Sequence, residues 1–319
     1  MATARDIKRR ISSVKNISQV TRALEAVSAS RVRRAQDQVM SSRPYAHKAW
    51  EVLVNLASAK GAAEHPLLEK RDEINSIDII LVTSDRSLCG SYNDNIIRLA
   101  ERFAAHHRKK GQAIRWIPVG RKGADFLTRT RQEIVAEFSN LPTPLGYSDV
   151  LPIGKLVIED YLAHAADGLF IAYTDFVNTL VQHPTVINLL PLQRYKAIDG
   201  DEETIVKKEP DVTTGGRDYI YEPTATALLD EVVPRFTILE IYHALLESLA
   251  SEHSARMIAM RNASENANAL ADDLTLEYNK ARQSAITAEI LDIVGGVNAL
   301  ETGRQRANPD QVQDILSAE

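Results

Sequence analysis

The fold is decided by residues 235–294, RFTILEIYHALLESLASEHSARMIAMRNASENANALADDLTLEYNKARQSAITAEILDIV, which contain neither proline nor glycine. A continuous helix of this length would measure about 90 Å, far more than helices in globular proteins usually span. At coiled-coil spacing, with steps of three and four, twelve of sixteen positions are apolar, whereas about seven are expected from a composition that is 44 % hydrophobic. These positions are Leu239, Tyr242, Leu246, Leu249, His253, Arg256, Met260, Ala263, Ala267, Leu270, Leu274, Glu277, Ala281, Ser284, Ala288 and Leu291. The pattern predicts a long helix with one narrow apolar stripe, flanked from Ser251 to Ser284 by small or polar residues.

The other end of the chain carries a matching pattern. Neither proline nor glycine occurs from Met1 to Arg43, and apolar residues recur there at steps of three or four. They are Ile7, Ile11, Val14, Ile17, Val20, Leu24 and Val27. Each terminal helix lacks a complete core of its own, so the simplest solution is an antiparallel coiled coil in which the two stripes bury each other. We expect an N-terminal helix within residues 1–60, a C-terminal helix within 223–300, and a polar tail at 301–319.

Between the two ends, predicted strands alternate with predicted helices. The run Ile77–Thr83, IDIILVT, is continuously apolar and β-branched, which is typical of a buried parallel strand. Further strands are predicted at 113–119, 135–138, 169–173 and 186–192, and helices at 94–108, after Gly123 and at 148–164. This alternation predicts a Rossmann-like α/β domain over residues 70–222, with a largely parallel sheet flanked by helices. Residues 199–217 are expected to form a polar loop or a short hairpin.

The turn after the first strand lacks the motifs of nucleotide-binding α/β proteins. It reads SDRSLCGSYN, with no GxGxxG and no GxxxxGK[ST], and Asp85 stands where a phosphate would need bare backbone N–H groups. The eight histidines are scattered, and Cys89 is the only cysteine, so no metal signature and no internal disulfide is expected. We also expect neither a membrane span nor a secretory leader. An enzymatic role and a cofactor therefore have no positive support.

Charge is distributed unevenly along the chain. Up to Arg43 there are ten lysines or arginines and three acidic residues, although the whole chain has a net charge of −5. A basic helix can bind nucleic acid, a membrane surface or an acidic protein, and it can also be a plain solvated face. Because no aromatic residues are interleaved with the basic ones in a known pattern, nucleic acid is not expected as a partner.

Several blocks of sequence, in order along residues 1 to about 300, resemble the γ subunit of F-type ATP synthase. The blocks are ARDIKRRISSVKNISQVTRALEAVSASRVRRAQ, TSDRSLCGSYN, INLLPL, DYIYEP and YNKARQSAITAEILDIVGGVNAL. Within the last block, ITAEILDIVGGVNA, Ile286 to Ala299, is similar to the signature segment of that family. Agreement in several ordered blocks is much more specific than any one of them.

The resemblance implies a non-catalytic rotor subunit. Its terminal helices would form a coiled coil inside a ring of α and β subunits, and its central domain would lie against the ε subunit and the c-ring. The complex would place the chain at the bacterial plasma membrane, peripherally on the cytoplasmic side, with no cofactor of its own.

The resemblance also assigns contact residues. Arg282 and Gln283 match a pair that contacts a loop of β, and Thr287, Glu289 and Leu24 belong to the same set of coupling contacts. Tyr219 and Glu222 match residues that face ε and the c-ring.

The chain departs from the family pattern in several places. Leu24 stands where methionine is usual, and His253 where glutamine is common. The loop at 196–217 is longer than in many bacterial members and has no cysteines, and the tail after Leu300 extends beyond the usual end.

Two other interpretations remain open from the residues alone. The chain could be an autonomous α/β nucleotide-binding protein or enzyme with coiled-coil extensions, which would bind a nucleotide unaided. It could also be a basic helical nucleic-acid binder, whose affinity would fall steeply with salt.

Overall fold

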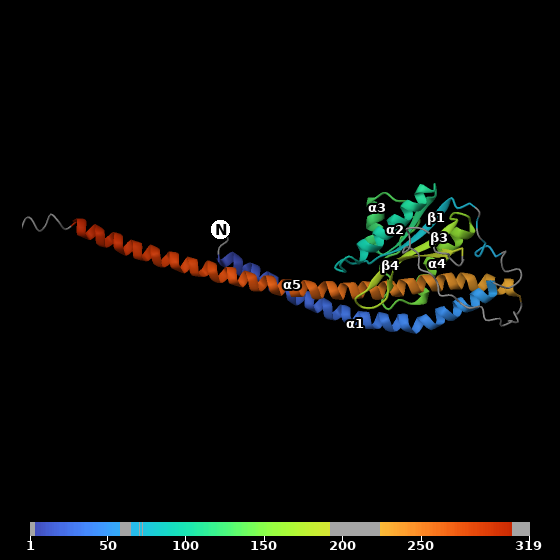
Figure 1. Cartoon of the computed structure of the whole chain (residues 1–319), viewed down its shortest axis with the longest axis horizontal. Helices are drawn as coiled ribbons and strands as arrows, with labels where there is room; N and C mark the ends of the chain where they lie inside the picture. Colours follow the sequence, from blue (N-terminus) through green and yellow to red (C-terminus); the bar gives the residue numbers. More distant parts are fainter. Residues whose placement is uncertain (1–3, 58–64, 70, 72, 192–223, 308–319) are drawn as a thin grey trace, which may run out of the picture. The chain divides into compact units, whose positions relative to one another are not determined.

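The computed structural model describes residues 4–57, 65–69, 71, 73–191 and 224–307. The chain divides into two compact units: residues 1–23 with 261–319, here called the paired-helix unit, and residues 24–260, here called the α/β unit. Helices α1 (Ala4–Ala57) and α5 (Ala225–Ala307), both labelled in Figure 1, each contribute residues to both units. This confirms the predicted combination of long terminal helices, paired as an antiparallel coiled coil, with a central α/β domain.

A four-stranded sheet forms the centre of the α/β unit. Its strands are β1 (Ser76–Val82), β2 (Ala113–Val119), β3 (Gly168–Phe176) and β4 (Gln182–Leu190), in the spatial order β2-β1-β3-β4. β1 is parallel to β2 and β3, whereas β4 pairs antiparallel with β3, so the sheet is largely parallel as predicted. The predicted strand at 135–138 is not one of them. Ile134 and Phe138 make only isolated bridges to Trp116 and Val119, and their half-buried side chains offer no fully buried face.

Helices cover both faces of the sheet. Helices α2 (Tyr92–Lys109) and α3 (Arg121–Arg129) pack on the face that carries Ile77, Ile79 and Leu81 of β1. Helix α4 (Tyr147–Leu162) and parts of α1 and α5 pack on the other face, where Ile80 and Val82 point. The side chains of β1 thus alternate between two hydrophobic clusters.

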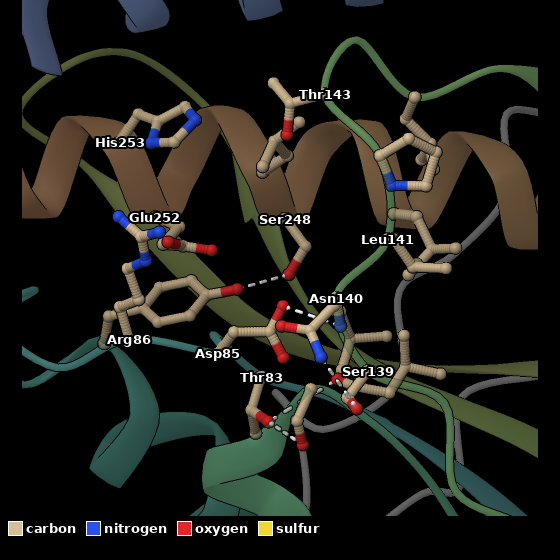
Figure 2. Close-up of a pocket in the computed structure, with 18 of the residues that line it drawn as sticks. Thr83, Asp85, Arg86, Ser139, Asn140, Leu141, Thr143, Ser248, Glu252 and His253 are labelled. Carbon is tan, nitrogen blue, oxygen red and sulfur yellow. Dashed lines mark hydrogen bonds between the residues drawn. The ribbon is translucent and has the colours of Figure 1, made fainter.

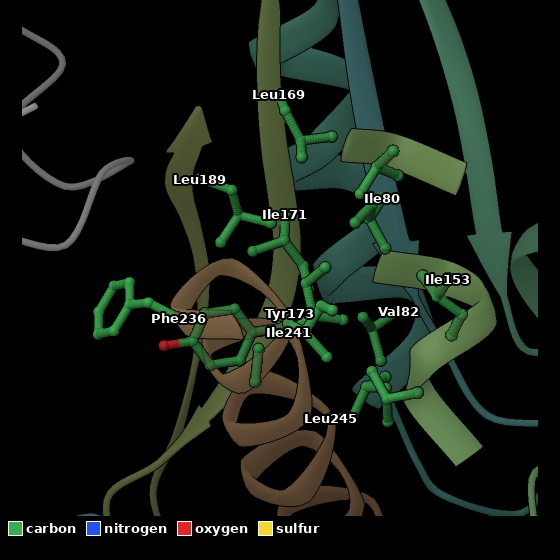
Figure 3. Packing of buried hydrophobic residues seen from close by; sticks show 14 of the residues in the cluster. Ile80, Val82, Ile153, Leu169, Ile171, Tyr173, Leu189, Phe236, Ile241 and Leu245 are labelled. Carbon is green, nitrogen blue, oxygen red and sulfur yellow. The ribbon is translucent and has the colours of Figure 1, made fainter. Parts of the chain in front are cut away.

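The cluster that contains Ile80 and Val82 explains why the first part of α5 belongs to the α/β unit and not to the paired-helix unit. Figure 3 shows Phe236, Ile241 and Leu245 of α5 against Ile171 and Tyr173 of β3. On α1, the buried residues of the cluster are Ala35, Val39, Leu53 and Leu56. The division into units therefore differs from the predicted boundaries 1–60, 70–222 and 223–300, because residues 24–57 of α1 and 225–260 of α5 belong to the α/β unit.

Helix α5 is also longer at both ends than the proline and glycine spacing predicts. It begins at Ala225, contains Pro234, and ends at Ala307, beyond Gly295 and Gly296. A proline inside a helix removes one backbone donor, but the buried residues Val233 and Phe236 hold this turn in the core. The predicted tail at 301–319 therefore starts too early, and its residues 308–319, like the loop at 199–217, lie outside the described residues.

An ion-pair network joins β1, β2 and α4. Asp78 on β1 lies opposite Arg115 on β2, with Arg115 Nε 3.1 Å from Asp78 Oδ1, and the same guanidinium contacts Asp160 of α4. Asp78 is fully buried, and this burial raises its pKa to about 6 against the opposing charge of Arg115. The charges of Asp160 and Glu133 add to the rise.

We predict a pH dependence of stability from Asp78. Its pKa is raised on folding from an ordinary value of 3.8, so the folded chain binds this proton more tightly than the unfolded chain. The contribution of Asp78 to the free energy of unfolding should therefore increase by about 1.4 kcal/mol as the pH falls from 7.5 to 5. Urea unfolding of the wild type and Asp78→Asn at several pH values measures the difference. A difference that does not change over this range would contradict the prediction.

The turn between β2 and α3 depends on Gly120. Its φ is +108°, and a Cβ built there would overlap the backbone carbonyl oxygen of Thr83. Thr83 Oγ1 accepts a hydrogen bond from Gly123 N at 2.8 Å and donates to Gly120 O at 3.2 Å. Close backbone approach, as well as backbone conformation, requires glycine at position 120.

Gly120→Ala should therefore destabilise the chain by at least about 3 kcal/mol, because a clash is added to an unfavourable φ. Gly111→Ala is the matched control, since Gly111 has φ +82° but open space around a built Cβ. This control should cost only about 1 kcal/mol. Urea unfolding compares the two variants, and equal losses would show that the clash is unimportant.

Candidate functional site

The paired-helix unit is held together by a seam that is partly polar. On α1 the buried or half-buried positions are Ile7, Ile11, Val14, Ser18 and Thr21, at strict steps of four and three. The predicted stripe is wrong at Ile17, Val20 and Val27, which are 51 %, 59 % and 50 % exposed, whereas its member Leu24 is half-buried.

The corresponding stripe on α5 is also shifted. Its buried members within the paired-helix unit are Ser264, Ala267, Ala271 and Leu274, whereas the predicted Leu270 is 49 % exposed and Glu277 is exposed. Ser264 and Ala271 thus replace the predicted Ala263 and Leu270 as central seam positions. The strict four-three spacing can be found in the sequence only if serine, threonine and alanine are accepted as buried seam residues.

Hydrogen bonds make this choice of residues possible. Ser18 Oγ donates to Asn268 Oδ1 at 2.7 Å and lies 3.4 Å from Ser264 Oγ, and Thr21 Oγ1 donates to the Ile17 carbonyl at 3.0 Å. Buried hydroxyls are tolerated when they are hydrogen-bonded, and small side chains allow two helices to approach closely. Ser18 and Thr21 therefore occupy the seam, and the side chains of Ile17 and Val20 lie on the exposed surface of α1.

The residues expected to contact β lie on an exposed stretch of α5. Arg282, Gln283, Thr287 and Glu289 are all exposed, and Thr287 Oγ1 donates to the Gln283 carbonyl at 2.9 Å within the helix. With about 100° of rotation per residue, Arg282 and Glu289 lie on one face, and Gln283 and Thr287 on a second face roughly 100–140° away. The helix therefore brings these residues together as two pairs and not as one cluster.

A stripe of large apolar residues, here called the terminal stripe, is uncovered on the same stretch. Its members are 47–74 % exposed and follow the strict steps of four and three. They are Ile286, Ile290, Ile293, Val297 and Leu300. Contiguous exposed apolar residues at coiled-coil spacing indicate a surface that a partner covers. Leu270 and Leu276, also exposed, interrupt the hydrophilic surface predicted for 251–284.

Of the remaining predicted contact residues, only Leu24 lies within the described part of the chain. Leu24 is half-buried on α1, and its carbonyl accepts a hydrogen bond from Ser28 Oγ at 2.8 Å. Tyr219 and Glu222 lie outside the described residues.

In the turn after β1, the carboxylate of Asp85 occupies the place where a bound anion such as phosphate would accept backbone hydrogen bonds. The carboxylate of Asp85 accepts hydrogen bonds from the backbone N–H of Arg121 at 3.1 Å and of Asn140 at 3.0 Å. Arg121 is the first residue of α3, so Asp85 occupies the end of a helix that would otherwise attract a phosphate. This agrees with the sequence argument against a nucleotide site at the turn, and it adds the contact with the loop at Asn140, which sequence reasoning missed.

Polar groups fasten α5 to the start of α2 and to the turn after β1. Tyr92 Oη, at the start of α2, lies 2.6 Å from Ser248 Oγ. Arg256 Nη2 donates to the carbonyl oxygens of Arg86 at 3.3 Å and Ser87 at 3.4 Å, and Arg256 Nη1 pairs with Glu252 at 2.7 Å. Burial raises the pKa of Glu252 despite the charge of Arg256. The pKa of His253 is lowered to about 4, mainly by burial and further by the charges of Arg256 and Arg31, so His253 is neutral at pH 7. Figure 2 shows Ser248, Glu252 and His253 together on α5.

The described residues hold neither a metal-binding cluster nor a helix suited to span a membrane. They contain no group of three or more His, Cys, Asp or Glu side chains that could hold a metal ion. None of the described helices is long and apolar enough to cross a membrane. Cys89 is buried, as expected for a small apolar residue.

Solved structures share the fold. A chain of the Euglena gracilis mitochondrial ATP synthase is similar with a TM-score of 0.63 and 18 % identity, over 94 % of this chain and 95 % of that one. A chain of the central stalk and c-ring of the Tetrahymena thermophila mitochondrial ATP synthase is similar with a TM-score of 0.56 and 22 % identity, over 77 % of this chain and 99 % of that one.

Sequence relatives give the family. The model of the family described as ATP synthase matches residues 3–300. The ATP synthase gamma chain of Dehalococcoides mccartyi is 44 % identical over 94 % of this chain and 100 % of its own length, and that of Chloroflexus aurantiacus is 45 % identical over 94 % and 99 %. The chain therefore belongs to the ATP synthase gamma chain family.

Proposed function

We propose that this chain is the central rotor stalk, the γ subunit, of an F-type ATP synthase. It couples ion-driven rotation of the c-ring to synthesis and hydrolysis of ATP at the β subunits of the α/β ring. The observation that carries the proposal is the pairing of the two chain ends into a long two-helix unit, in a chain 44 % identical to gamma chains over 94 % of its length. Its partners are the α and β subunits, the ε subunit and the c-ring, and nucleic acid is not among them.

The chain contributes no catalytic group of its own in this proposal. Phosphate chemistry belongs to the ring, and rotation changes the ring by differential contact: each β site meets a different side of the rotor and is stabilised in a different conformation. The carboxylate of Asp85, held by two backbone N–H groups, supports this division because it fills the position that a bound phosphate would need.

Two surfaces of α5 are proposed to meet the ring. The terminal stripe, from Ile286 to Leu300, would be covered by apolar surface of α and β, which would act as a bearing. Arg282 and Gln283 would contact a β loop, where a guanidinium can donate two hydrogen bonds to a carboxylate. Because Arg282 with Glu289 and Gln283 with Thr287 lie on different faces, these pairs would engage the ring at different rotational angles.

Other contacts extend the proposal along the chain. Leu24, half-buried on α1, would present an apolar contact to β. Tyr219 and Glu222 would face ε and the c-ring. Through these partners the chain is part of a membrane-bound complex, and we place it peripherally on the cytoplasmic side of a bacterial plasma membrane.

Arg282→Ala combined with Gln283→Ala should leave assembly intact and lower coupled ATP turnover by about tenfold. Both residues are exposed, so their loss removes a transient contact and no folding contact. Reconstitution with α and β, followed by ATPase measurement, tests this. Asp272→Ala with Asp273→Ala, two exposed positions on the same helix, is the matched control and should retain full turnover. Unchanged turnover in the first double variant would remove the proposed contact.

The free chain should not bind MgATP at micromolar concentrations, whereas the chain assembled with α and β should support hydrolysis. Isothermal titration of the free chain and an ATPase assay of the assembled ring measure the two states. Micromolar binding of ATP by the free chain would instead favour an autonomous nucleotide-binding protein.

A further inference from the structure

A partly open cavity of about 300 Å³ lies within the α/β unit, at the carboxyl ends of β1 and β2 and beside α5. Its walls come from the turn after β1, the loop at 139–145, Arg31 of α1 and α5 from Leu245 to His253. Figure 2 shows Asp85 and Arg86 on the turn, Asn140 and Thr143 on the loop, and His253 on α5. The carboxyl ends of parallel strands are where open α/β sheets bind small ligands.

His253 supplies a buried donor that lacks an acceptor. The residue is 4 % exposed, and its Nδ1 lies 3.4 Å from Arg256 Nη1. A guanidinium can only donate, so Nδ1 of the neutral imidazole is the acceptor and the ring proton is on Nε2. Nε2 is buried and has no hydrogen-bond partner among the described residues. Buried polar groups normally have a partner, so this atom points to a ligand with an acceptor.

The charges around the cavity leave one positive charge unbalanced. Arg31 and Arg86 line it; both are exposed, and neither side chain has a hydrogen bond or ion pair within the described part of the chain. The charge of Arg31 also acts on Glu252 and His253. The two lining carboxylates are already engaged, Glu252 by Arg256 and Asp85 by two backbone N–H groups. Arg256 pairs with Glu252 but does not itself line the cavity. With that pair neutral, the two lining arginines face the carboxylate of Asp85 alone, which leaves one positive charge. A single anionic group would balance it, whereas a polyphosphate would be repelled by Asp85 and Glu252.

The rest of the wall is mixed, with polar residues such as Asn140, Thr143 and Ser248 beside four leucines. Leu145 and Leu245 are buried there, and Leu141 and Leu249 are half-buried. The volume is at the lower end of the range for ligand pockets, so it suits a small molecule. We propose that this cavity binds a small monocarboxylate with an aliphatic body, its carboxylate held by Arg31, Arg86 and the Nε2–H of His253.

The test is titration of the full-length chain with hexanoate, followed by calorimetry and by NMR of ¹⁵N-labelled histidine side chains. Hexanoate should bind and shift the Nε2 resonance of His253. Acetate, hexanol, succinate and inorganic phosphate should each bind about tenfold more weakly or not at all, because each lacks the aliphatic body or the single charge. Measurement on the free chain makes the outcome independent of the rotor function.

Variants locate the binding. Arg86→Gln removes an exposed charge without touching the core and should weaken hexanoate binding about tenfold. His253→Leu should weaken it similarly, and His183→Leu, an exposed position outside the cavity, should leave it unchanged. No binding of hexanoate at millimolar concentrations, or equal binding by the wild type and Arg86→Gln, would overturn the proposal. Binding of an acidic peptide alone, without free carboxylates, would overturn it in favour of a protein-docking surface.

Discussion

The structure depends on one constraint: two long helices from opposite ends of the chain must bury a narrow stripe against each other. A narrow stripe buries little hydrophobic surface, so van der Waals contact between closely packed helices has to supply the remaining stabilisation. Ser18, Ser264 and Ala267 make that approach possible, since each is small and the serine hydroxyls are hydrogen-bonded across the seam. Larger apolar side chains at these positions would push the helices apart, and Ile17 and Val20 accordingly lie outside.

The same two helices also complete the α/β unit. Leu229 to Ala250 of α5 and Ala35 to Leu56 of α1 contribute to the cluster that covers one face of the sheet. Side chains of both long helices are therefore packed directly into the core of the α/β unit. The hydrogen bond between Tyr92 of α2 and Ser248 of α5 adds a directional contact to this packing.

The elements of the α/β domain could be predicted from the sequence because their signals are local. The strand at 113–119 has the predicted bounds, since an apolar run is followed directly by Gly120. The seam could not be predicted fully, because the choice between Ile17 and Ser18 is decided by the partner helix, where Asn268 accepts the Ser18 hydroxyl. The role of Asp85 could be predicted only in part. An acidic residue at this position argues against a bound phosphate, but its hydrogen bond with Asn140 could not be predicted because the two residues are 55 apart in sequence. The contact residues Arg282 and Gln283 come from family resemblance, and their exposure is compatible with it.

The pairing of the chain ends can be tested most directly by a disulfide across the seam. Ser18→Cys and Ser264→Cys would place two thiols where the hydroxyl oxygens are now 3.4 Å apart, on a background in which Cys89 is replaced by serine. The account predicts that the disulfide forms rapidly on oxidation and that ATP turnover of the assembled ring is unchanged, since both thiols turn together with the rotor. Failure of the disulfide to form in the folded chain, or loss of turnover when it does form, would contradict the account.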